Sequence, residues 1–401
     1  MSLSIGIVGL PNVGKSTLFN ALVKNALAEA HRAHRSKPLG STSSSVDDDN
    51  QFIGTSSNAS AKVGNFPFTT IEPNVGVVAV PDERLNKLAE IEHSAKVVPA
   101  TVKFVDIAGL IRGASAGEGL GNQFLSHIRE VDAICLVARA FGGETIHVEG
   151  SVDPARDLET VLTELALADL QTLTQRKLTL TSDAKKPGKD GENAKVALAL
   201  AERMESHLNE NKTDFAALLD KDELELARRH LPLLTLKPYL VVLNVDEAEV
   251  GESPKNLREK FKLSKTVASA PIVVISAKIE AELVSLDDGE QEEYLQSLGL
   301  EASGLDRLAQ AGYSLLDLLT FLTAGHMEAR AWTVVSGATA AEAAGVIHTD
   351  FQKKFIRAEV VAYNDFVSNG GWKGVSQKGV MRLEGRDYVV RDGDVVFFRH
   401  G

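Results

Sequence analysis

The sequence predicts an α/β protein whose first part is a mainly parallel sheet covered by helices on both faces. Short apolar runs typical of buried strands alternate with amphipathic segments of helical period, which is the pattern of βαβ units. A glycine-rich turn stands between the first apolar run and the first amphipathic segment, where such sheets bind phosphate. With 401 residues, the chain is long enough for two or three domains.

The expected strands of this sheet are short and apolar, as strands buried on both faces are. The first contains Ile5, Ile7 and Val8 and stops at Gly9. Later strands are predicted at Val75–Val80, Thr101–Asp106, Ala133–Ala138, Tyr239–Asn244 and Ile272–Ile275. Helices are predicted from Ser16 onward, at Glu83–Ile91 and at Leu120–Val131.

Residues 29–62 interrupt this alternation. The segment from Glu29 to Lys62 has 34 residues, eight of them serines, and almost no apolar side chains. Such a composition cannot bury enough surface to offset the entropy lost on ordering. We therefore predict a disordered insertion, which is either a spacer or a regulatory loop open to phosphorylation.

Residues 151–231 have a different pattern, typical of a helical hairpin. Apolar side chains recur at helical spacing in two stretches, first at Leu158, Leu162 and Leu165, then at Val196, Leu200, Met204 and Leu208. The polar segment Asp183–Asn193 between them is predicted to be the turn. Its lysines, Lys185, Lys186 and Lys189, are interpreted as solvated side chains, with contact to RNA as the alternative.

Residues 319–401 are predicted to form a small mixed β domain. Short strands are expected at Phe355–Tyr363, Asp387–Val390 and Asp394–Arg399, and a helix at Ala340–Val346. Glycines at 370, 371 and 393 mark turns between them.

Composition limits the possible environments and partners. The formal net charge is −12, so no global positive field attracts the chain to nucleic acid or anionic lipid, and any RNA contact requires a local basic patch. Cys135 is the single cysteine, which excludes an intrachain disulfide or a cysteine zinc cluster and favours a reducing compartment. No apolar run approaches the roughly 20 residues of a membrane span. We expect a cytoplasmic monomer without membrane contact.

The clearest motif is the segment Gly9–Thr17, GLPNVGKST, which fits G-x-x-x-x-G-K-[ST]. It lies after an apolar strand and before a helix, as this phosphate-binding loop requires. The backbone amides would surround the phosphates, Lys15 would bridge the β- and γ-phosphates, and the Ser16 hydroxyl would bind Mg²⁺.

A second element supplies the other side of the magnesium site. Asp106 ends a predicted strand and begins D-x-x-G, which would place its carboxylate near the metal and the Gly109 amide near the γ-phosphate. Between the two motifs, Thr70 is the candidate for the switch threonine that closes on Mg²⁺, with Thr69 as the competitor. Lys15, Thr70 and Gly109 are thus the expected catalytic set, and Ser16, Thr70 and Asp106 the expected metal ligands.

The predicted base-reading loop departs from the pattern of guanine-specific enzymes. Those enzymes place Asn-Lys-x-Asp after this strand, whereas this chain has Asn244-Val245-Asp246-Glu247. The longer Glu247 would misalign the two hydrogen bonds that an aspartate makes to guanine, which favours relaxed or adenine-leaning specificity. The loop Ser276-Ala277-Lys278 is expected on the other side of the base. After D-x-x-G, Leu110 replaces the glutamine that orients the attacking water, which predicts slow intrinsic turnover.

Together these motifs resemble the Obg-like ATPases, also called the YchF family. The resemblance rests on GLPNVGKS, FPFTTIEPNVG, DIAGLIRGASAGEGLGNQFL, the NVDE element and AAGVIHTDFQKKFIRAEV, and it covers nearly the whole chain except residues 29–62. It implies a P-loop NTPase G domain at 1–150 and 232–318, an inserted helical coiled-coil hairpin at 151–231 and a β-grasp TGS domain at 319–401. It also implies hydrolysis of ATP in preference to GTP, and association with ribosomes and their RNA.

The resemblance also implies individual roles. The segment Asn12-Val13-Gly14-Lys15-Ser16-Thr17 would hold the phosphates, and Val245 would line the adenine pocket beside Asn244. Asn12 matches an asparagine that binds K⁺ in potassium-activated relatives, so K⁺ is a second candidate cofactor. Leu136 lies where many family members have a histidine implicated in hydrolysis.

The leading hypothesis is therefore a Mg²⁺-dependent ATPase, weaker on GTP, that acts as a nucleotide switch on the ribosome. One alternative is a GTPase despite the altered loop. Another is a ribosome- or RNA-binding adaptor in which the nucleotide is a structural or regulatory ligand with little turnover.

Overall fold

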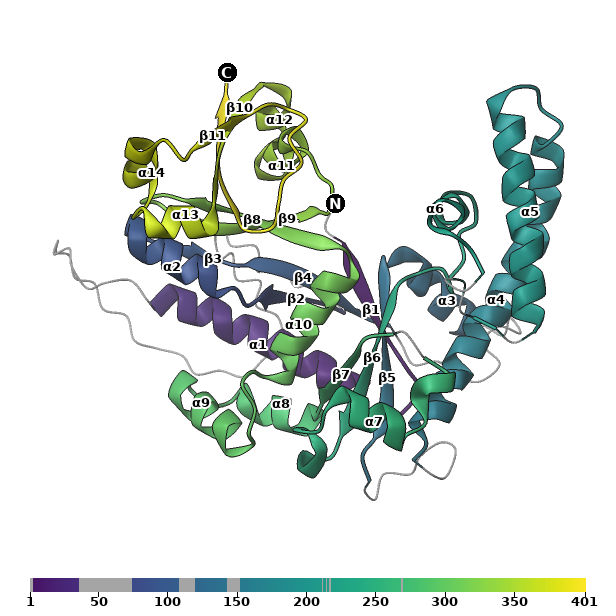
Figure 1. The fold of residues 1–401 in the computed structure, drawn as a ribbon. Helices are drawn as coiled ribbons and strands as arrows, with labels where there is room; N and C mark the ends of the chain where they lie inside the picture. The colour runs from purple at the N-terminus through teal and green to yellow at the C-terminus, as the bar shows by residue number, and fades with distance from the viewer. Residues whose placement is uncertain are drawn as a thin grey trace, which may run out of the picture.

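The computed structural model describes residues 3–35, 74–107, 120–142, 152–210, 212–213, 215, 218–267 and 270–401. Two six-stranded sheets organise these residues (Figure 1). No helix in these ranges combines the length and apolarity needed to cross a bilayer.

The first sheet has the order β2-β4-β1-β5-β6-β7 and confirms the predicted α/β class. Every neighbouring pair is parallel except β2 and β4, which run antiparallel. The strands are β1 (Ser4–Val8), β2 (Val75–Val80), β4 (Ala100–Asp106), β5 (Ala133–Ala140), β6 (Tyr239–Val245) and β7 (Ile272–Ile275). Because the central strand β5 is buried along its whole length, its sequence is a continuous apolar run rather than an alternating one.

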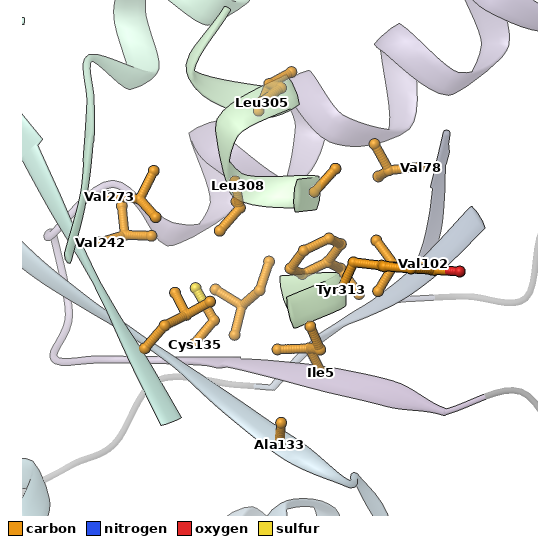
Figure 2. Close-up of a cluster of buried hydrophobic side chains, with 14 of the residues drawn as sticks. Ile5, Val78, Val102, Ala133, Cys135, Val242, Val273, Leu305, Leu308 and Tyr313 are labelled. Atoms are coloured by element: carbon orange, nitrogen blue, oxygen red, sulfur yellow. The ribbon is translucent and has the colours of Figure 1, made fainter. Parts of the chain in front are cut away.

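Helices cover both faces of this sheet. On one face α10 (Gly304–Leu315) places Leu305, Leu308 and Tyr313 over Ile5 and Cys135, as Figure 2 shows. The other face carries the first turns of α4 (Pro154–Asp183), because Ile134 and Leu136 line a small cavity together with Leu162 and Leu165 of that helix. The remaining helices of this part are α1 (Lys15–Arg35), α2 (Glu83–Glu92), α3 (Leu120–Glu130), η3 (Glu247–Glu249), α7 (Pro254–Lys260), η4 (Leu263–Lys265), α8 (Ala277–Leu283) and α9 (Asp288–Ser297).

The predicted start of the disordered insertion is wrong. We expected irregular structure from Glu29, but α1 continues through Arg35. The stretch 29–35 contains two alanines and two arginines, which are strong helix formers, so the helix continues past its apolar part. Residues 36–62 lie outside the described ranges.

The predicted helical hairpin is present as an arm made of α4 (Pro154–Asp183) and α5 (Lys189–Asn209), followed by α6 (Lys221–His230). Figure 1 shows α4 and α5 projecting side by side from the sheet. The turn is shorter than predicted, because α5 already begins at Lys189. Of the tip lysines, Lys186 pairs with Asp183 across 2.7 Å.

The second sheet has the order β11-β10-β12-β8-β9-β3. Its last strand, β3 (Val97–Val98), comes from the part of the chain that precedes β4 and pairs with β9. The C-terminal unit is therefore joined to the first one by backbone pairing as well as by packing. The other strands are β8 (Leu318–Ala324), β9 (Ala329–Val335), β10 (Phe355–Ala362), β11 (Arg382–Glu384) and β12 (Asp394–His400).

The predicted strands at Phe355–Tyr363 and Asp394–Arg399 are confirmed as β10 and β12, but the one at Asp387–Val390 is wrong. Only one bridge forms there, between Thr339 and Val389. The stretch is too short to extend the ladder before the turn at Gly393 leads into β12. The helices of this unit are α11 (Ala340–Ile347), which confirms the prediction, α12 (Thr349–Lys353), α13 (Tyr363–Ser368) and α14 (Trp372–Lys378).

Candidate nucleotide-binding site

The glycine-rich loop lies where the sequence places it, between the end of β1 and the start of α1. A Cβ on Gly9 would lie 2.4 Å from the carbonyl oxygen of Val137, so the loop can leave the sheet here only with glycine. Asn12 and Gly14 have positive φ angles of 63° and 97°, which turn the backbone sharply before the helix. After this turn, the first amides of α1 lie beyond the carboxyl end of β1 and are open to a ligand, as an anion site at a helix N-terminus requires.

Lys15 is the most strongly perturbed cation of this site. Its side chain is 7% exposed, and its Nζ donates a hydrogen bond to the carbonyl oxygen of Leu10 at 2.7 Å. Burial lowers the pKa of Lys15 to about 8, and the negative charge of Asp106 acts in the opposite direction. The ammonium group is therefore desolvated and has one neutral acceptor, an arrangement suited to receiving an anionic ligand.

Asp106 ends β4 close to Lys15. Its backbone N–H donates to the carbonyl oxygen of Asn74 at 2.9 Å, which fixes the strand end where β2 begins. Burial raises the pKa of the Asp106 carboxyl, and the charge of Lys15 lowers it. Ser16, in the first turn of α1, is exposed.

These donors fit Mg²⁺, because the ion prefers oxygen ligands and is usually held by one or two carboxylates together with substrate phosphates and water. An adjacent divalent cation would also compensate the partly desolvated charge of Asp106. Within the described ranges, no group of three or more His, Cys, Asp or Glu side chains is placed to hold a metal ion by itself. Thr69, Thr70, Gly109 and Leu110 lie outside the described residues.

Asn244 connects the phosphate loop with both predicted base-side loops. At 6% exposure, its Nδ2 donates to the carbonyl oxygen of Val13 and its Oδ1 accepts from the amide of Ala277, each at 3.0 Å. Gly14 is required beside it, since a Cβ there would lie 2.2 Å from Nδ2. One buried amide thus holds three separate segments around a common space.

That space is an open cleft of about 940 Å³. Val245 and Ser276 lie at its base and are nearly buried, whereas Glu247 and Lys278 are exposed at its edge. The residues that line the cleft are Gly14, Thr17, Phe141, Gly142, Asn244, Val245, Asp246, Glu247, Ala248, Ser276, Ala277, Lys278, Ala281, Glu282 and Ser285. The structure therefore brings the phosphate loop and the two predicted base-side loops together around one cleft.

Sequence reasoning missed the wall formed by Phe141 and Gly142 at the end of β5. The amide of Gly142 donates to Asp246 at 2.9 Å, which ties this wall to the base-reading loop. The ring of Phe141 lies under the guanidinium of Arg139, 4.4 Å from its centroid, and Arg139 is 1% exposed. An arginine inside an otherwise apolar strand, two residues before Phe-Gly-Gly, was the signal available in the sequence.

Leu136, in contrast, lies away from this cleft. It is 1% exposed and contacts a small cavity lined by Leu162, Leu165 and Leu234 under α4. A histidine at this position would lie among apolar side chains of the sheet face opposite α10. The neighbouring Cys135 points to the α10 face and is fully buried, and burial raises the pKa of its thiol, consistent with a small apolar core residue.

Comparison with family models identifies both ends of the chain. Residues 4–47 and 50–176 match MMR_HSR1, described as a 50S ribosome-binding GTPase. Residues 318–401 match YchF-GTPase_C, described as a protein of unknown function (DUF933).

Curated relatives match this chain along its whole length. The ribosome-binding ATPase YchF of Bacillus subtilis (strain 168) is 45% identical over 403 residues, covering 100% of this chain and 99% of that protein. The protein of the same name from Haemophilus ducreyi is 46% identical over 400 residues, with the same coverage. Among solved structures, the Schizosaccharomyces pombe YchF GTPase superposes with a TM-score of 0.80 at 33% identity, over 99% of this chain and 98% of that one.

Proposed function

The chain belongs to the YchF family, and from this premise we propose that it is a Mg²⁺-dependent ATPase, weaker on GTP, that binds ribosomes and switches with its nucleotide. The observation that carries the proposal is Asn244, which joins the phosphate loop and the base-side loops around one cleft with a buried lysine at its phosphate end. The curated relatives are named ribosome-binding ATPases.

The phosphate end of the cleft supplies positioning and charge. Lys15 would exchange its bond to the Leu10 carbonyl for the β- and γ-phosphate oxygens, and the amides of residues 12–17 would surround them. A buried cation and oriented amides stabilise the charge that develops as water attacks the γ-phosphorus in line with the leaving oxygen. Bound Mg²⁺, held by Ser16 and Asp106 with Thr70 as a further ligand, would neutralise the phosphate oxygens. Gly109 would place its amide near the γ-phosphate.

The base end supports a preference for adenine. Glu247 is the first residue of η3 and stands exposed at the edge of the cleft, where a guanine-specific enzyme has the shorter aspartate. Asp246 is already bonded to the Gly142 amide and is therefore less available to a base. Val245 would contact the adenine ring with Phe141 on the opposite wall, and Ser276, Ala277 and Lys278 would contact its edge.

Competition of ATP and GTP for a fluorescent nucleotide analogue tests this assignment. We expect ATP to bind more tightly, Glu247→Asp to shift the preference toward GTP, and Glu259→Asp, an exposed change on α7 outside the cleft, to leave it unchanged. Tighter binding of GTP by the parent chain would overturn the adenine assignment.

Single-turnover hydrolysis with and without ribosomes tests the enzymatic part. We expect slow hydrolysis that ribosomes accelerate, and loss of nucleotide binding or hydrolysis in Lys15→Ala. Unchanged hydrolysis in that variant would refute the site. Absence of hydrolysis in both conditions would instead favour an adaptor that uses the nucleotide as a ligand.

Potassium is proposed as a second ion. Asn12 is exposed at the turn of the phosphate loop, so its side-chain oxygen is accessible to a cation beside the phosphates. Faster turnover in K⁺ than in Na⁺ buffer is expected, and equal rates would remove this part of the proposal.

We also propose that the chain works as a cytoplasmic monomer, because ribosome binding requires access to the cytosol. Its domains are proposed at 1–150 with 232–318, at 151–231 and at 319–401. This division is supported by the hydrophobic clusters of the described residues. Besides the cluster around the first sheet, one lies within the arm and one lies beneath α11.

A further inference from the structure

Arg139 is a buried cation to which the chemistry described above assigns no role. It is 1% exposed, and in the described part of the chain it is the largest side chain with less than 2% exposure. The other residues of β5 are alanine, isoleucine, cysteine, leucine and valine. Burying a guanidinium costs free energy that only well-placed partners offset, so its position in an apolar strand requires an explanation.

The contacts of Arg139 lead to Phe141, two residues further along the chain. The Nε of Arg139 donates a hydrogen bond to the carbonyl oxygen of Phe141 at 3.2 Å. The carbon of its guanidinium lies over the Phe141 ring, 4.4 Å from the ring centroid. One side chain therefore holds both the backbone and the ring of Phe141, and it covers one face of that ring.

Phe141 in turn lies in the wall of the nucleotide cleft, beside the base-reading loop. The last residue of β5 pairs in register with Val245 of β6, and the amide of Gly142 donates to Asp246 at 2.9 Å. The Phe141 side chain is half-buried, whereas Arg139 lies behind it in the interior. The guanidinium thus supports the ring from within the protein, while the ring borders the space that a base would occupy.

We propose that Arg139 is a positioning residue for the nucleobase, and that it holds the Phe141 ring as a platform on which a purine stacks. This inference rests on the nucleotide binding proposed above and concerns the faces of the base rather than its edge. Aromatic rings stack on any base, and the two fused rings of a purine bury more area than a pyrimidine does. The platform therefore favours purine over pyrimidine nucleotides and leaves the choice between adenine and guanine to the loop that contains Glu247.

A cation behind the ring promotes stacking in front of it for two reasons. The faces of an aromatic ring carry partial negative charge, and a guanidinium on one face attracts that charge. The base then meets a ring with less electron density, so the repulsion between the two π systems is smaller. The ring is also held in one orientation before the nucleotide arrives, so binding does not have to order it.

The unaltered chain provides the first test. In the proton NMR spectrum of ATP bound to the full chain with Mg²⁺, the H2 and H8 protons of adenine should move upfield, because protons above an aromatic ring are shielded. Phe141→Leu should abolish this shift, and Arg139→Met should reduce it. Bound ATP whose adenine protons keep the chemical shifts of free ATP would overturn the platform.

Titration calorimetry separates stacking from a general loss of structure. Arg139→Met replaces the guanidinium with an apolar side chain of similar length, so ATP and GTP should both bind about three- to thirtyfold more weakly. UTP should lose less, and inorganic tripolyphosphate, which has no base, should bind as it does to the parent. Equal weakening of all four ligands would assign Arg139 a merely structural role and refute the proposal.

Phe141→Leu keeps the proposal testable if Arg139→Met does not fold, because it changes a half-buried side chain at the surface of the cleft. It should weaken ATP binding about tenfold or more and leave tripolyphosphate unaffected. Adding Arg139→Met to Phe141→Leu should cost no further ATP affinity, because the cation then has no ring to hold. Additive losses would show that Arg139 does not act through Phe141.

Arg330→Met is the matched control. Its guanidinium carbon lies 4.6 Å from the centroid of the Trp332 ring, on β9 and outside the cleft. The same substitution there should leave the affinity for all four ligands unchanged.

The outcomes distinguish this inference from the proposed function. If the parent chain binds ATP without the upfield shift and without coupling between the two positions, the platform is wrong and the nucleotide site remains. If the parent binds neither ATP nor tripolyphosphate, the proposed function itself is wrong.

Discussion

At the scale of single residues, Lys15 shows how the site is prepared for an anion. Its ammonium group is nearly buried and keeps one neutral acceptor, the Leu10 carbonyl, and burial lowers its pKa to about 8. Phosphates placed against it would favour the charged form and raise the pKa again. The free and nucleotide-bound chains therefore hold different numbers of protons above pH 8.

This difference predicts a pH dependence of ATP affinity. Below about pH 8 Lys15 is already protonated and affinity is at its full value. Above it the free chain loses the proton that the complex needs, so affinity should fall by up to about tenfold per pH unit. Titration calorimetry just above pH 8, in two buffers of different ionisation enthalpy, should show proton uptake. Lys15→Arg keeps its charge, so its residual affinity should not fall over this range, and absence of proton uptake by the parent would contradict the prediction.

Asn244 provides a second prediction at this scale. Asn244→Ala leaves the Val13 carbonyl and the Ala277 amide without their buried partner. An unsatisfied buried polar group costs about 1–3 kcal/mol, so both thermal stability and nucleotide affinity should fall. Asn256→Ala is the control, because its exposed amide contacts Glu252 and its loss should stay within about 0.5 kcal/mol. Equal effects of the two variants on nucleotide affinity would show that the bridge does not organise the cleft.

At the scale of elements, a helix, strand or loop can be predicted best from the sequence when a single physical cause determines its residue pattern. The strands β1, β5, β6 and β7 are buried on both faces, and their continuous apolar runs follow from that. The phosphate loop could be predicted from its glycines, because Gly9 lies against the Val137 carbonyl and Gly14 has a positive φ angle. Strands β8 and β9 were missed, because each mixes buried and half-exposed positions in short stretches without clear alternation.

Contacts between distant elements explain the remaining differences. Nothing in the local pattern of Val97–Val98 indicates pairing with a strand more than two hundred residues later. Phe141 lies in the wall of the cleft beside Gly142, whose amide donates to Asp246 just after β6, a contact between residues more than a hundred positions apart.

The joint between α8 and α10 gives a prediction at the scale of elements. Glu280 is 1% exposed and accepts hydrogen bonds from the amides of Gly304 and Leu305, which begin α10. Burial raises its pKa to about 7, above the ordinary 4.5. The protonated Glu280 side chain therefore contributes its full share of stability below pH 4.5. This contribution is lost as the pH rises toward 7, because the folded state must then bury the charged carboxylate.

Glu280→Gln should remove this pH dependence. The amide oxygen can still accept from Gly304, but the side chain does not titrate. The stability of the variant relative to the parent should therefore increase between pH 4.5 and 7, by up to about 3 kcal/mol. Thermal denaturation across this range measures the difference. Glu282→Gln, an exposed change on the same helix, should show no such trend, and a parallel pair of curves for Glu280→Gln and the parent would contradict the assignment.

At the scale of the whole molecule, α4 joins the arm to the nucleotide domain. Its first turns, with Leu158, Val161 and Leu165, belong to the core of the first sheet. Its later turns, with Leu173 and Leu180, belong to the core of the arm. One continuous helix of 30 residues therefore takes part in both cores and links the arm to the sheet that carries the cleft.

Asp169 fixes this helix to the strand that carries Asn244. It is fully buried, and its carboxylate accepts from the amides of Leu234 and Thr235 at 2.8 Å and from the Thr235 hydroxyl at 2.6 Å. These residues lead directly into β6, whose far end forms the base-reading loop. The contact therefore lies on one of the covalent connections between the arm and the cleft.

Asp169→Ala should consequently lower ATP affinity as well as stability. The buried amide of Leu234 and the partly buried amide of Thr235 lose their acceptor, at up to about 1–3 kcal/mol each, so the loss of stability should exceed that of Thr235→Val, which removes the hydroxyl and leaves both amide bonds in place. Chemical denaturation measures this difference, and limited proteolysis should show the arm becoming accessible first. ATP affinity should fall in Asp169→Ala and stay close to that of the parent in Thr235→Val. If both variants lost stability and ATP affinity equally, the amide bonds from Asp169 would not be what couples the arm to the cleft.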